Sequence, residues 1–514
     1  MIYIIGSGPS GVAAAVALVK RGLHPTVLDA GVEPDPSVSA LKARLASVEP
    51  DEWTSEDLSR IKGIGPDGRS GIPRKLHFGS DFAYRDIDRR SAAAAEHVTM
   101  LRSFARGGLS NVWGGVMQPL SSADFHSWPI GFGELAPHYA EVRRMMDLGL
   151  DENVHVSAQS QAFYDDLESH QNDLDRQGIH FDYAKVAVRT RDDGAKKGCR
   201  YCGLCLYGCP YDAIFNAANL LSSLVCHGSV SYVSGVIVDR ISSMDGRLRI
   251  EARSTTGDGV RLFETGKVFL AAGVLETARI VLNSTNLKSA SVLARQSDIF
   301  TIPILRFRSS GQVDRERIST LSQIVLRVED EGICAQPVHL QLYGYNDLYM
   351  SILQRRFGTV AVPMKPVLNC AVERLFVAFG YLHSEVSSAI RIIRLATSSG
   401  SLRLESRFNI EGQHVGRAVA RKLLRNRKYF NALPLWFDVR FDEPGAGHRI
   451  GASFPMRRTP RPHETNHWGV LPDLQGVHLV DASVLSSVSA APIAFTAMAN
   501  AHRIGSECPI TDAA

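Results

Sequence analysis

The sequence lacks any uninterrupted run of about 18 apolar residues, the length that a membrane-spanning helix requires. It also has no strong excess of charge of one sign, because 57 Lys and Arg stand against 53 Asp and Glu. A formal net charge of +4 does not indicate a nucleic-acid partner. The basic start and cleavable apolar core of a secretory signal are missing around 1–5, so we expect a cytoplasmic protein without a transmembrane segment.

Cysteine is scarce, since eight residues in a chain of 514 do not make a disulfide scaffold. Apolar residues make up 45% of the chain and charged residues 21%, which excludes a mainly disordered chain or a coiled coil. The length allows about two to four domains. The scarce cysteines are not spread evenly, because four of the eight lie between 199 and 209.

The first thirty residues have the pattern of a dinucleotide-binding unit. A short apolar run leads into Gly6-Ser7-Gly8-Pro9-Ser10-Gly11, a helix is expected over 12–20, and a second strand ends at Asp29. Glycines permit a tight turn and a close approach of backbone to pyrophosphate, and the helix N-terminus offers N–H groups to it. Asp29 stands where a carboxylate accepts hydrogen bonds from the ribose hydroxyls. The candidate phosphate-binding residues are Gly6, Gly8, Pro9, Ser10 and Gly11.

A second segment of nucleotide-binding character lies at 267–273, with the sequence KVFLAAG. Its strand ends in small residues, and a helix is expected to follow over 274–282. This pattern is common where the chain of an FAD-binding domain comes back to the cofactor after an insertion. No second complete GxGxxG is present, so the sequence favours FAD over a separate NAD(P)H domain.

Three further segments carry a family resemblance. They are RGGLSNVWGG at 106–115, His448-Arg449-Ile450-Gly451, and the long C-terminal stretch 476–505, GVHLVDASVLSSVSAAPIAFTAMANAHRIG. In these segments the sequence resembles the glucose-methanol-choline (GMC) oxidoreductases, especially the pyranose oxidase and sugar dehydrogenase branch. The resemblance covers the FAD-binding segments, about half of the chain.

The resemblance implies an α/β fold, with a Rossmann-type FAD-binding domain and an inserted α+β substrate domain. Residues 1–120, 199–295 and 445–514 would form the first, and 121–198 and 296–444 the second. Some relatives carry a His at 111–112 that attaches the flavin covalently. This chain has Asn111-Val112 there, so non-covalent FAD is expected. The further residues that the resemblance places at the cofactor are Gly107, Gly108, Ser110, Asn111, Gly115, Val236, Ala272, Asp481, Ala482 and Ile493.

His448 is the expected catalytic residue. In the family the equivalent His faces the flavin and takes a proton from the substrate hydroxyl. Imidazole suits this task because it titrates near the working pH. The family's second His or Asn, before the last helix, falls here at Pro492 or Ala491, and neither side chain transfers a proton. His502, on the last helix, is expected to be structural.

The four clustered cysteines, Cys199, Cys202, Cys205 and Cys209, have the C-x2-C-x2-C-x3-C-P spacing of bacterial ferredoxins. Thiolates at this spacing suit an iron–sulfur cluster of three or four irons, and Cys226 is a candidate remote ligand. Some GMC sugar dehydrogenases resemble this chain here and carry a cluster, whereas other relatives have a cysteine-rich loop without metal. Zinc is a further alternative.

The middle of the chain adds two candidate elements. Residues 336–345, QPVHLQLYGY, alternate as a strand, which would place His339, Gln341 and Tyr343 on one face with Tyr345 continuing it. That face either contacts substrate or is solvated. Residues 414–429 read as a basic amphipathic helix, whose charged face is either solvated or docks an acidic electron acceptor or an anionic substrate.

These observations favour an FAD-dependent dehydrogenase that oxidises a CH–OH group of a sugar, glycoside or polyol-like alcohol. Electrons would then leave through the cluster to an external one-electron acceptor. Three alternatives stay open: a peroxide-forming oxidase without a cluster, a biosynthetic reductase or epimerase acting on a sugar or natural-product intermediate, and a non-catalytic FAD electron-transfer protein.

Overall fold

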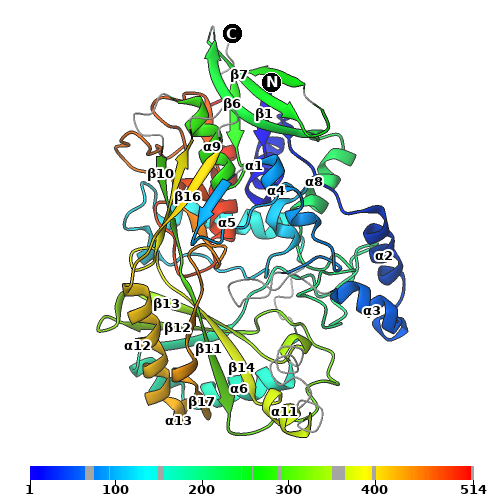
Figure 1. Ribbon diagram of the computed structural model, residues 1–514, viewed down its shortest axis with the longest axis vertical. Helices are drawn as coiled ribbons and strands as arrows, with labels where there is room; N and C mark the ends of the chain where they lie inside the picture. The colour runs from blue at the N-terminus through cyan, green and yellow to red at the C-terminus, as the bar shows by residue number, and fades with distance from the viewer. Residues whose placement is uncertain are drawn as a thin grey trace.

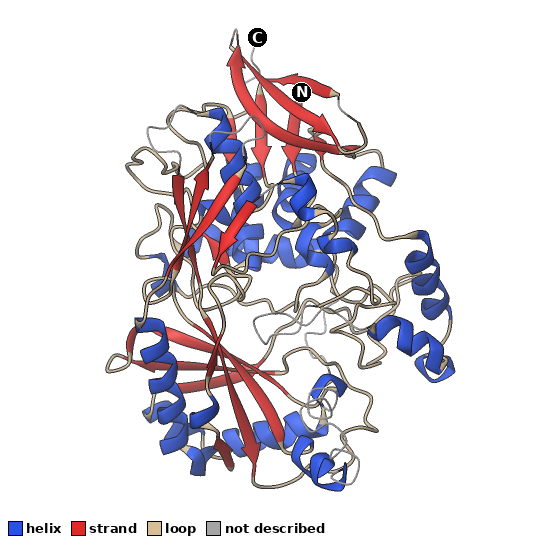
Figure 2. Ribbon diagram, in the orientation of Figure 1, coloured by secondary structure: helices blue, strands red, loops and turns tan. Residues whose placement is uncertain are grey.

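The computed structural model describes residues 1–63, 75–91, 93–148, 155–244, 246–257, 259–285, 291–349, 365–395 and 401–510. Figure 1 shows two lobes, one above the other, with both chain termini at the top of the upper lobe. The upper lobe carries the first strand and the last helix of the chain. The lower lobe is built around one large antiparallel sheet, as Figure 2 shows.

A parallel sheet of five strands organises the upper lobe. Its strand order is β20-β9-β1-β2-β5, and every neighbouring pair is parallel. Strands β1, β9 and β20 are short apolar runs that are almost completely buried, as expected for strands covered on both faces, whereas the edge strand β5 is partly exposed. They span β1 Ile2–Ile5, β2 Thr26–Leu28, β5 Ser231–Val233, β9 Lys267–Leu270 and β20 Val477–Leu479.

Two antiparallel units extend the upper lobe. A three-stranded meander contains β6 Val236–Met244, β7 Arg247–Ser254 and β8 Val260–Thr265. A mixed sheet has the order β19-β10-β15-β16-β3. Its strands are β3 Ala93–Glu96, β10 Ser291–Gln296, β15 Ala389–Arg394, β16 Leu402–Arg407 and β19 Ile450–Gly451.

A seven-stranded sheet forms the lower lobe, with the order β17-β11-β14-β13-β12-β4 and β18 paired to β11. Figure 2 shows helices on its lower side, away from the upper lobe. One face carries the apolar side chains of the second core, including Val338, Leu340 and Leu342. The strands are β4 Ile179–Tyr183, β11 Ile299–Arg306, β12 Ile324–Asp330, β13 Cys334–Tyr343, β14 Leu375–Tyr381, β17 Ala432–Pro434 and β18 Arg440–Phe441.

The helices divide between the two lobes. In the upper lobe α1 packs against α14, and α14 packs against α5. The helices are α1 Pro9–Lys20, α2 Pro36–Ser47, α3 Ser55–Lys62, α4 Ile87–Arg90, α5 Phe132–Met145, α6 Ala158–Glu168, α7 Gln171–Arg176, α8 Ala217–Cys226, α9 Val274–Ser284, α11 Lys365–Val372, α12 Glu411–Arg425, α13 Arg427–Phe430 and α14 Ala494–Glu507. Within the described ranges, no helix is long and apolar enough to cross a membrane.

The structure confirms the expected α/β architecture with a parallel nucleotide-type sheet and a second sheet-based lobe. It places two segments differently from the expected division. Helix α5 and strands β15 and β16 contribute to the core of the upper lobe, through residues such as Leu135, Ile390 and Leu402. The expected substrate segments 121–198 and 296–444 therefore each contain a part that packs with the first core. Ser398-Ser399-Gly400, whose composition predicts a turn, lies outside the described residues.

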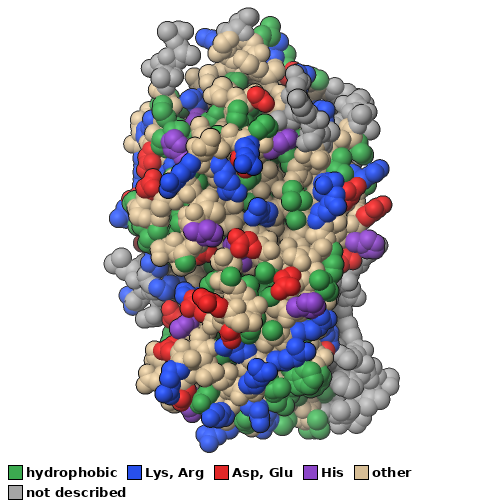
Figure 3. Space-filling model, turned by 90° about the vertical axis from the view of Figure 1, so that its left-hand side faces the viewer, with side chains coloured by type: hydrophobic (Ala, Val, Ile, Leu, Met, Phe, Trp, Pro, Cys, Tyr) green, Lys and Arg blue, Asp and Glu red, His purple; other side chains and the backbone are tan. Residues whose placement is uncertain are grey.

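Both elements expected in the middle of the chain are present. Strand β13 places His339, Gln341 and Tyr343 on the face opposite the apolar core, whereas Tyr345 lies beyond the end of the strand. The basic segment forms α12 and α13, and α12 buries Val415, Val419 and other apolar residues against the sheet. Figure 3 looks onto this side of the molecule, and basic side chains gather in its lower third beside an apolar patch.

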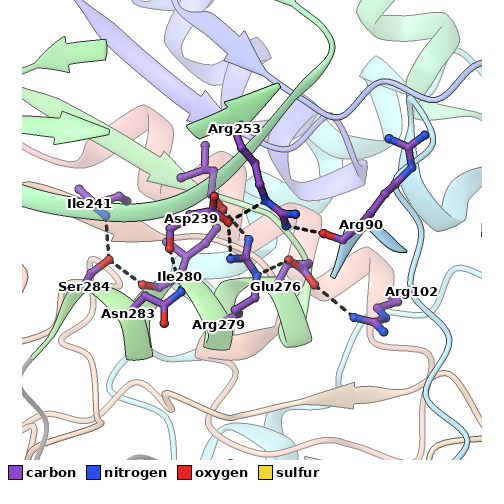
Figure 4. A network of polar contacts seen from close by, with 11 residues as sticks. Arg90, Arg102, Asp239, Ile241, Arg253, Glu276, Arg279, Ile280, Asn283 and Ser284 are labelled. Atoms are coloured by element: carbon purple, nitrogen blue, oxygen red, sulfur yellow. Dashed lines mark hydrogen bonds and ion pairs between the residues drawn. The ribbon is translucent and has the colours of Figure 1, made fainter. Parts of the chain in front are cut away.

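A buried ionic network attaches α9 to the meander (Figure 4). The guanidinium of Arg279 donates to Glu276 at 2.8 Å, to Asp239 at 2.7 Å and to the backbone oxygen of Val238 at 2.6 Å. Arg253 also donates to Asp239. Burial acts most strongly and would raise the pKa of Glu276, but the charges of Arg279 and Arg102 and the hydrogen bonds from Ser91 and Arg279 together outweigh it, so the pKa lies below its usual value. The network holds α9, which begins directly after the segment 267–273, against the meander.

Replacing Arg279 with Met should destabilise the protein by about 3–5 kcal/mol, because Glu276 and Asp239 then lose their main buried partner. In the variant, burial without Arg279 should raise the pKa of Glu276. The loss of stability should therefore be largest near neutral pH, where Glu276 is charged, and smaller toward pH ~4, where protonation removes that charge. Urea unfolding at several pH values measures this. Arg249→Met, which breaks the exposed pair with Glu264 on the same meander, should cost below about 1 kcal/mol. Equal losses for the two variants would contradict the role of the network.

Candidate cofactor and substrate site

The glycine loop follows β1 and begins α1 at Pro9, as the sequence predicts. Gly6 has a φ of +99°, and a Cβ there would lie 2.5 Å from the backbone oxygen of Ala271. A Cβ on Gly11 would lie 2.1 Å from the oxygen of Gly6. Both glycines are therefore required by the packing of α1 against β1 and β9. Gly8 differs, because a Cβ there meets nothing within 4 Å.

The N-terminus of α1 therefore faces open space beside Gly8. No side chain caps this helix, and the buried Ser10 and Gly11 belong to its first turn. Uncapped N–H groups at a helix N-terminus bind anions, with the helix dipole adding to the attraction. This is the arrangement that a pyrophosphate requires.

Asp29 lies at the end of β2 and accepts two side-chain hydrogen bonds. Ser7 Oγ donates to its Oδ2 at 2.5 Å, and the hydroxyl of Tyr232 donates to the same oxygen at 3.1 Å. Burial raises the pKa of Asp29 to about 6. Val236 lies beside it, because its N–H donates to the backbone oxygen of Asp29. Sequence reasoning missed Ser7 and Tyr232; only the position of Ser7 inside the glycine motif was a signal.

The second glycine loop, 106–115, lies directly against the first. The N–H of Gly107 donates to Ser7 Oγ at 2.9 Å, and a Cβ on Gly108 would lie 3.4 Å from the Cα of Gly8. Ser7 thus connects the glycine loop, Asp29 and this second loop. Beyond the place of Ser7 in the glycine motif, no sequence feature predicted this connection.

The polar side chains of the second loop are used within the protein. Ser110 donates to the oxygen of Gly107 at 2.6 Å, and Asn111 donates to the oxygens of Arg106 and Gly108. Asn216, the N-cap of α8, donates to Asn111 at 2.7 Å. Ser110 and Asn111 therefore hold the loop in shape. Gly115, with a φ of +67°, lies where the chain leaves the loop toward Val116.

Asp481 connects the start of α9 to the turn that follows β20. Its carboxylate accepts from the N–H of Gly273 at 2.8 Å, from Thr277 Oγ1 at 2.6 Å and from the N–H of Ser483 at 2.9 Å. This side chain organises the backbone around it, and a cofactor contact here would come from backbone groups.

The remaining two cofactor candidates flank this region. Ala272 borders Gly6, because a Cβ on Gly6 would lie 3.2 Å from the Cα of Ala272. Ile493 is the N-cap of α14 and makes no side-chain capping bond. A second uncapped helix N-terminus therefore lies in this lobe.

The segment around His448 is attached to the turn at Asp481 and Ala482. Ala452 donates its N–H to the oxygen of Ala482 at 2.9 Å, and a Cβ on Gly451 would lie 2.6 Å from that oxygen. His448 has a φ of +56° and an exposed side chain. His448 does not line the cavity between the two lobes that is described below.

The next residue, Arg449, points inward. Its guanidinium lies 3.3 Å from the ring centroid of Tyr381 and donates to the backbone oxygen of Ala490. Burial lowers the pKa of Arg449 to about 10, and the side chain stays charged at neutral pH. Arg449 therefore joins β14 of the lower lobe to the segment that precedes α14. No sequence signal distinguished it.

A cavity of about 360 Å³ lies between the two lobes. One wall is the sheet face of β4, β12 and β13, and the other comes from the chain after the second glycine loop and from the segment before α14. The lining residues are Val116, Met117, Gln118, Pro119, Ser121, Asp124, Asp182, Tyr183, Lys185, Val325, Arg327, Pro337, His339, His383, Ser489, Ala490 and Ala491.

Two histidines line this cavity, His339 and His383. Burial lowers the pKa of His339 to about 3 and also lowers the pKa of His383. Both imidazoles are therefore neutral at pH 7, the form that accepts a proton. His339 was a candidate from strand alternation, whereas His383 was missed because it follows β14 in an irregular segment.

The four clustered cysteines are free thiols that lie close to one another. Cys199, Cys205 and Cys209 belong to or border one apolar cluster, and Cys202 and Cys209 border a second that includes residues of α2 and α3. Burial, and then the neighbouring Cys205, raise the pKa of Cys199 to about 12. Within the described part of the chain, no group of three or more Cys, His, Asp or Glu is arranged to hold a metal ion. The thiols as placed do not fit a cluster.

The cysteine segment lies beside the second glycine loop. A cavity of about 20 Å³ is lined by Asn111 of that loop and by Cys209, together with the half-buried Lys75 and the buried His77. Two backbone N–H groups donate to sulfur, from Tyr201 to Cys199 and from Ala213 to Cys209. Cys226, the candidate remote ligand, is exposed at the end of α8 and is outside both apolar clusters.

Comparison with known proteins identifies the fold. No protein-family model matches the sequence, and no curated protein matches it. Among solved structures, the chain is similar to pyridoxine 4-oxidase from Mesorbium loti, with a TM-score of 0.59, 14% identity and 98% of each chain covered. It is also similar to an FAD-dependent oxidoreductase from Chaetomium thermophilum, with a TM-score of 0.58, 11% identity and 98% of each chain covered. The chain has the fold of these oxidoreductases.

The two glycines of the loop give a matched pair of variants. Gly11→Ala should lower the melting temperature of the apoprotein by about 10 °C or more, because its Cβ meets backbone that cannot move. Gly8→Ala should leave it unchanged within about 2 °C, since φ at Gly8 is −67° and the space is open. Differential scanning calorimetry measures both. A stable Gly11→Ala variant would show that the close contact with Gly6 is not required.

Proposed function

We propose that the protein is an FAD-dependent oxidoreductase that oxidises the CH–OH group of a small alcohol. The observation that carries the proposal is the convergence of the glycine loop, Asp29 and the second glycine loop at one end of the parallel sheet, bridged by Ser7. The likeness in fold to two flavin-dependent proteins over nearly the whole chain supports it. The resemblance of the sequence to GMC oxidoreductases supports the same class of reaction.

The residues present fit FAD. The first turn of α1, with the open space beside Gly8, would hold the pyrophosphate, and the carboxylate of Asp29 would accept from ribose hydroxyls. Gly107 and Gly108 allow backbone to approach a planar ring, and the uncapped N-terminus of α14 would stabilise negative charge on it. When bound, FAD supplies an acceptor for the hydride that leaves the substrate carbon.

His448 is the base in this proposal. Its segment is hydrogen-bonded to the turn at Ala482, so the imidazole lies on a backbone fixed to a cofactor-holding segment. Imidazole accepts the hydroxyl proton of the substrate while hydride leaves the carbon. No second His or Asn precedes α14, because Ala491 and Pro492 stand there. His339 and His383, which line the cavity between the lobes, are the other imidazoles on the substrate side.

The substrate class proposed from the resemblance is a sugar, glycoside or polyol-like alcohol. The cavity between the lobes supports a polar substrate, because amide, carboxylate, ammonium, guanidinium and imidazole groups line it beside the apolar Val116 and Val325. Its volume of about 360 Å³ suits a small molecule. Pyridoxine is the substrate named for one protein of similar fold, so other small polar alcohols belong in the same substrate screen.

Electron exit through an iron–sulfur cluster to an external acceptor is a further part of the proposal. The ferredoxin-like spacing, the N–H···S hydrogen bonds and the position of Cys209 beside the second glycine loop support it. The thiols as placed do not form a metal site, so no step of the reaction is derived through a cluster. If no cluster is bound, we propose instead that oxygen accepts the electrons and is reduced to peroxide, which would make the protein an oxidase.

The cytoplasmic location expected from the sequence also remains a proposal.

Two alternatives differ in the direction of the chemistry. A reductase or epimerase of a biosynthetic intermediate would use the same FAD site with reduced flavin as donor. A non-catalytic electron-transfer protein would bind FAD, but no alcohol would reduce the flavin. The observation that most favours this alternative is the missing second His or Asn before α14.

Replacing His448 with Ala should slow anaerobic flavin reduction by an alcohol substrate about 10²- to 10⁴-fold, because the base is lost. FAD content should stay unchanged. Stopped-flow absorbance of the flavin, with a panel of sugars and small polar alcohols, measures the rate. His383→Ala is the matched control and should change the rate less than about tenfold. The opposite order of effects would transfer the role of base to His383, and unchanged rates in both variants would remove general-base catalysis by these residues.

Iron analysis separates the two electron exits. Protein purified without oxygen should contain about three or four irons per FAD, with about four acid-labile sulfides in either case, if the cysteines hold a cluster. Cys202→Ser should then lose iron and keep FAD, whereas Cys226→Ser should keep both. Iron-free protein after anaerobic expression with added iron would reject the cluster and leave a metal-free loop, and peroxide formation under air would then identify an oxidase.

A further inference from the structure

Helix α12 presents a row of basic side chains on the lower lobe. Its exposed residues recur at helical spacing and continue into α13. Four of these cations, Arg421, Arg425, Arg427 and Lys428, have no carboxylate partner among the described residues. Unpaired charges gathered on one face raise the local positive potential far above what a net charge of +4 for the chain implies.

Large apolar side chains are exposed next to this row. Trp436 and Phe437 form a short turn that contacts α12, and their side chains are 45% and 72% exposed. Phe307, which is 54% exposed, follows β11 and its N–H donates to Asn431, directly after α13. Three exposed aromatic rings beside four unpaired cations are unusual on a surface that only meets water. Figure 3 shows this combination as a blue row and a green patch in the lower third of the face.

The position of this surface argues against a role in electron exit. The cysteine segment packs against residues of α2 and α3, and Figure 1 shows these helices on the opposite side of the molecule from α12. An acceptor bound at α12 would therefore be remote from both the cysteines and the second glycine loop. We therefore consider a partner other than the electron acceptor for this surface.

We propose that α12, α13 and the turn at Trp436 and Phe437 form a docking surface for an anionic lipid membrane. Aromatic rings on a protruding turn enter the interface between headgroups and acyl chains, while neighbouring arginines and lysine contact lipid phosphates. The charge of the surface is complementary to anionic lipid headgroups, and the exposed rings lie on the turn at Trp436 and Phe437 and on the chain that follows β11. The inference does not depend on the oxidoreductase activity.

Vesicle co-sedimentation of the purified full-length protein tests this surface. The protein should bind vesicles of phosphatidylcholine with about 30% phosphatidylserine, and bind pure phosphatidylcholine at least tenfold more weakly. Raising the salt from about 0.05 M to 0.5 M should release most of it, because exposed charges are screened. Arg421→Glu/Arg425→Glu should weaken binding about 30-fold or more.

Matched controls come from the meander at the other end of the molecule. Arg240→Glu/Arg247→Glu makes the same change of charge on exposed residues of β6 and β7 and should leave vesicle binding nearly unchanged. Trp436→Ser/Phe437→Ser should weaken binding at least fivefold, whereas Val260→Ser/Leu262→Ser, at exposed residues of β8, should not. All positions are at the surface, and circular dichroism verifies folding.

Three results would overturn the proposal. The first is no binding to anionic vesicles at low salt, which would leave α12 as a solvated helix face. The second is equal loss in the meander controls, which would make the attraction a general effect of charge. The third is tight binding to heparin or RNA that requires the four cations but not Trp436 and Phe437, which would identify a polyanion site instead of a membrane surface.

Discussion

The contact of Gly6 and Gly11 with each other and with Ala271 fixes where the N-terminus of α1 lies on the parallel sheet. A Cβ at either glycine would lie within 2.5 Å of a backbone oxygen, so no other residue permits this approach. A Cβ on Gly8 would meet nothing within 4 Å, and the uncapped N-terminus of α1 begins at the next residue. Ser7 is held in the same turn, and its hydroxyl joins Asp29 and the second glycine loop. The geometry of the candidate dinucleotide site therefore follows from one close approach of backbone to backbone.

The second constraint is the carboxylate of Asp481. Three donors from two segments converge on it, and it holds the start of α9 against the turn that leads toward α14. The ionic network of Arg279 fixes the same helix from the meander side. The segment of His448 is hydrogen-bonded to Ala482, and Arg449 reaches from there to Tyr381 in the lower lobe. Arg449 is therefore one of the polar contacts that join the two lobes at the site.

Sequence predicted what local chemistry determines. The glycine loop, Asp29, the strand with His339 and the basic helix all carry a periodic or turn-specific signal, and the structure contains each of them. The long-range contacts carried no such signal. Ser7 and Tyr232 at Asp29, His383 in the cavity and the inward Arg449 come from residues that become neighbours only through tertiary packing. The same limit explains why α5, β15 and β16 were expected in the other lobe, since sequence position does not reveal which core an amphipathic segment joins.

The cysteine segment shows the limit of a spacing argument in a different way. Ferredoxin-like spacing predicts a cluster, whereas burial raises the pKa values of Cys199, Cys202 and Cys209 and so favours their protonated thiols. A bound cluster would deprotonate its ligands, so the two descriptions differ in protonation as well as in geometry. The flavin chemistry proposed for the upper lobe does not depend on which description holds.

The central claim is that the glycine loop, Asp29 and the second glycine loop bind FAD. Titration of the apoprotein with FAD, followed by quenching of flavin fluorescence, tests it most directly. The account predicts one FAD per chain, displacement by ADP-containing competitors, and binding at least tenfold weaker in Asp29→Asn, because the ribose hydroxyls lose a charged acceptor. Saturable binding of NAD in place of FAD, or FAD binding that Asp29→Asn leaves unchanged, would contradict it.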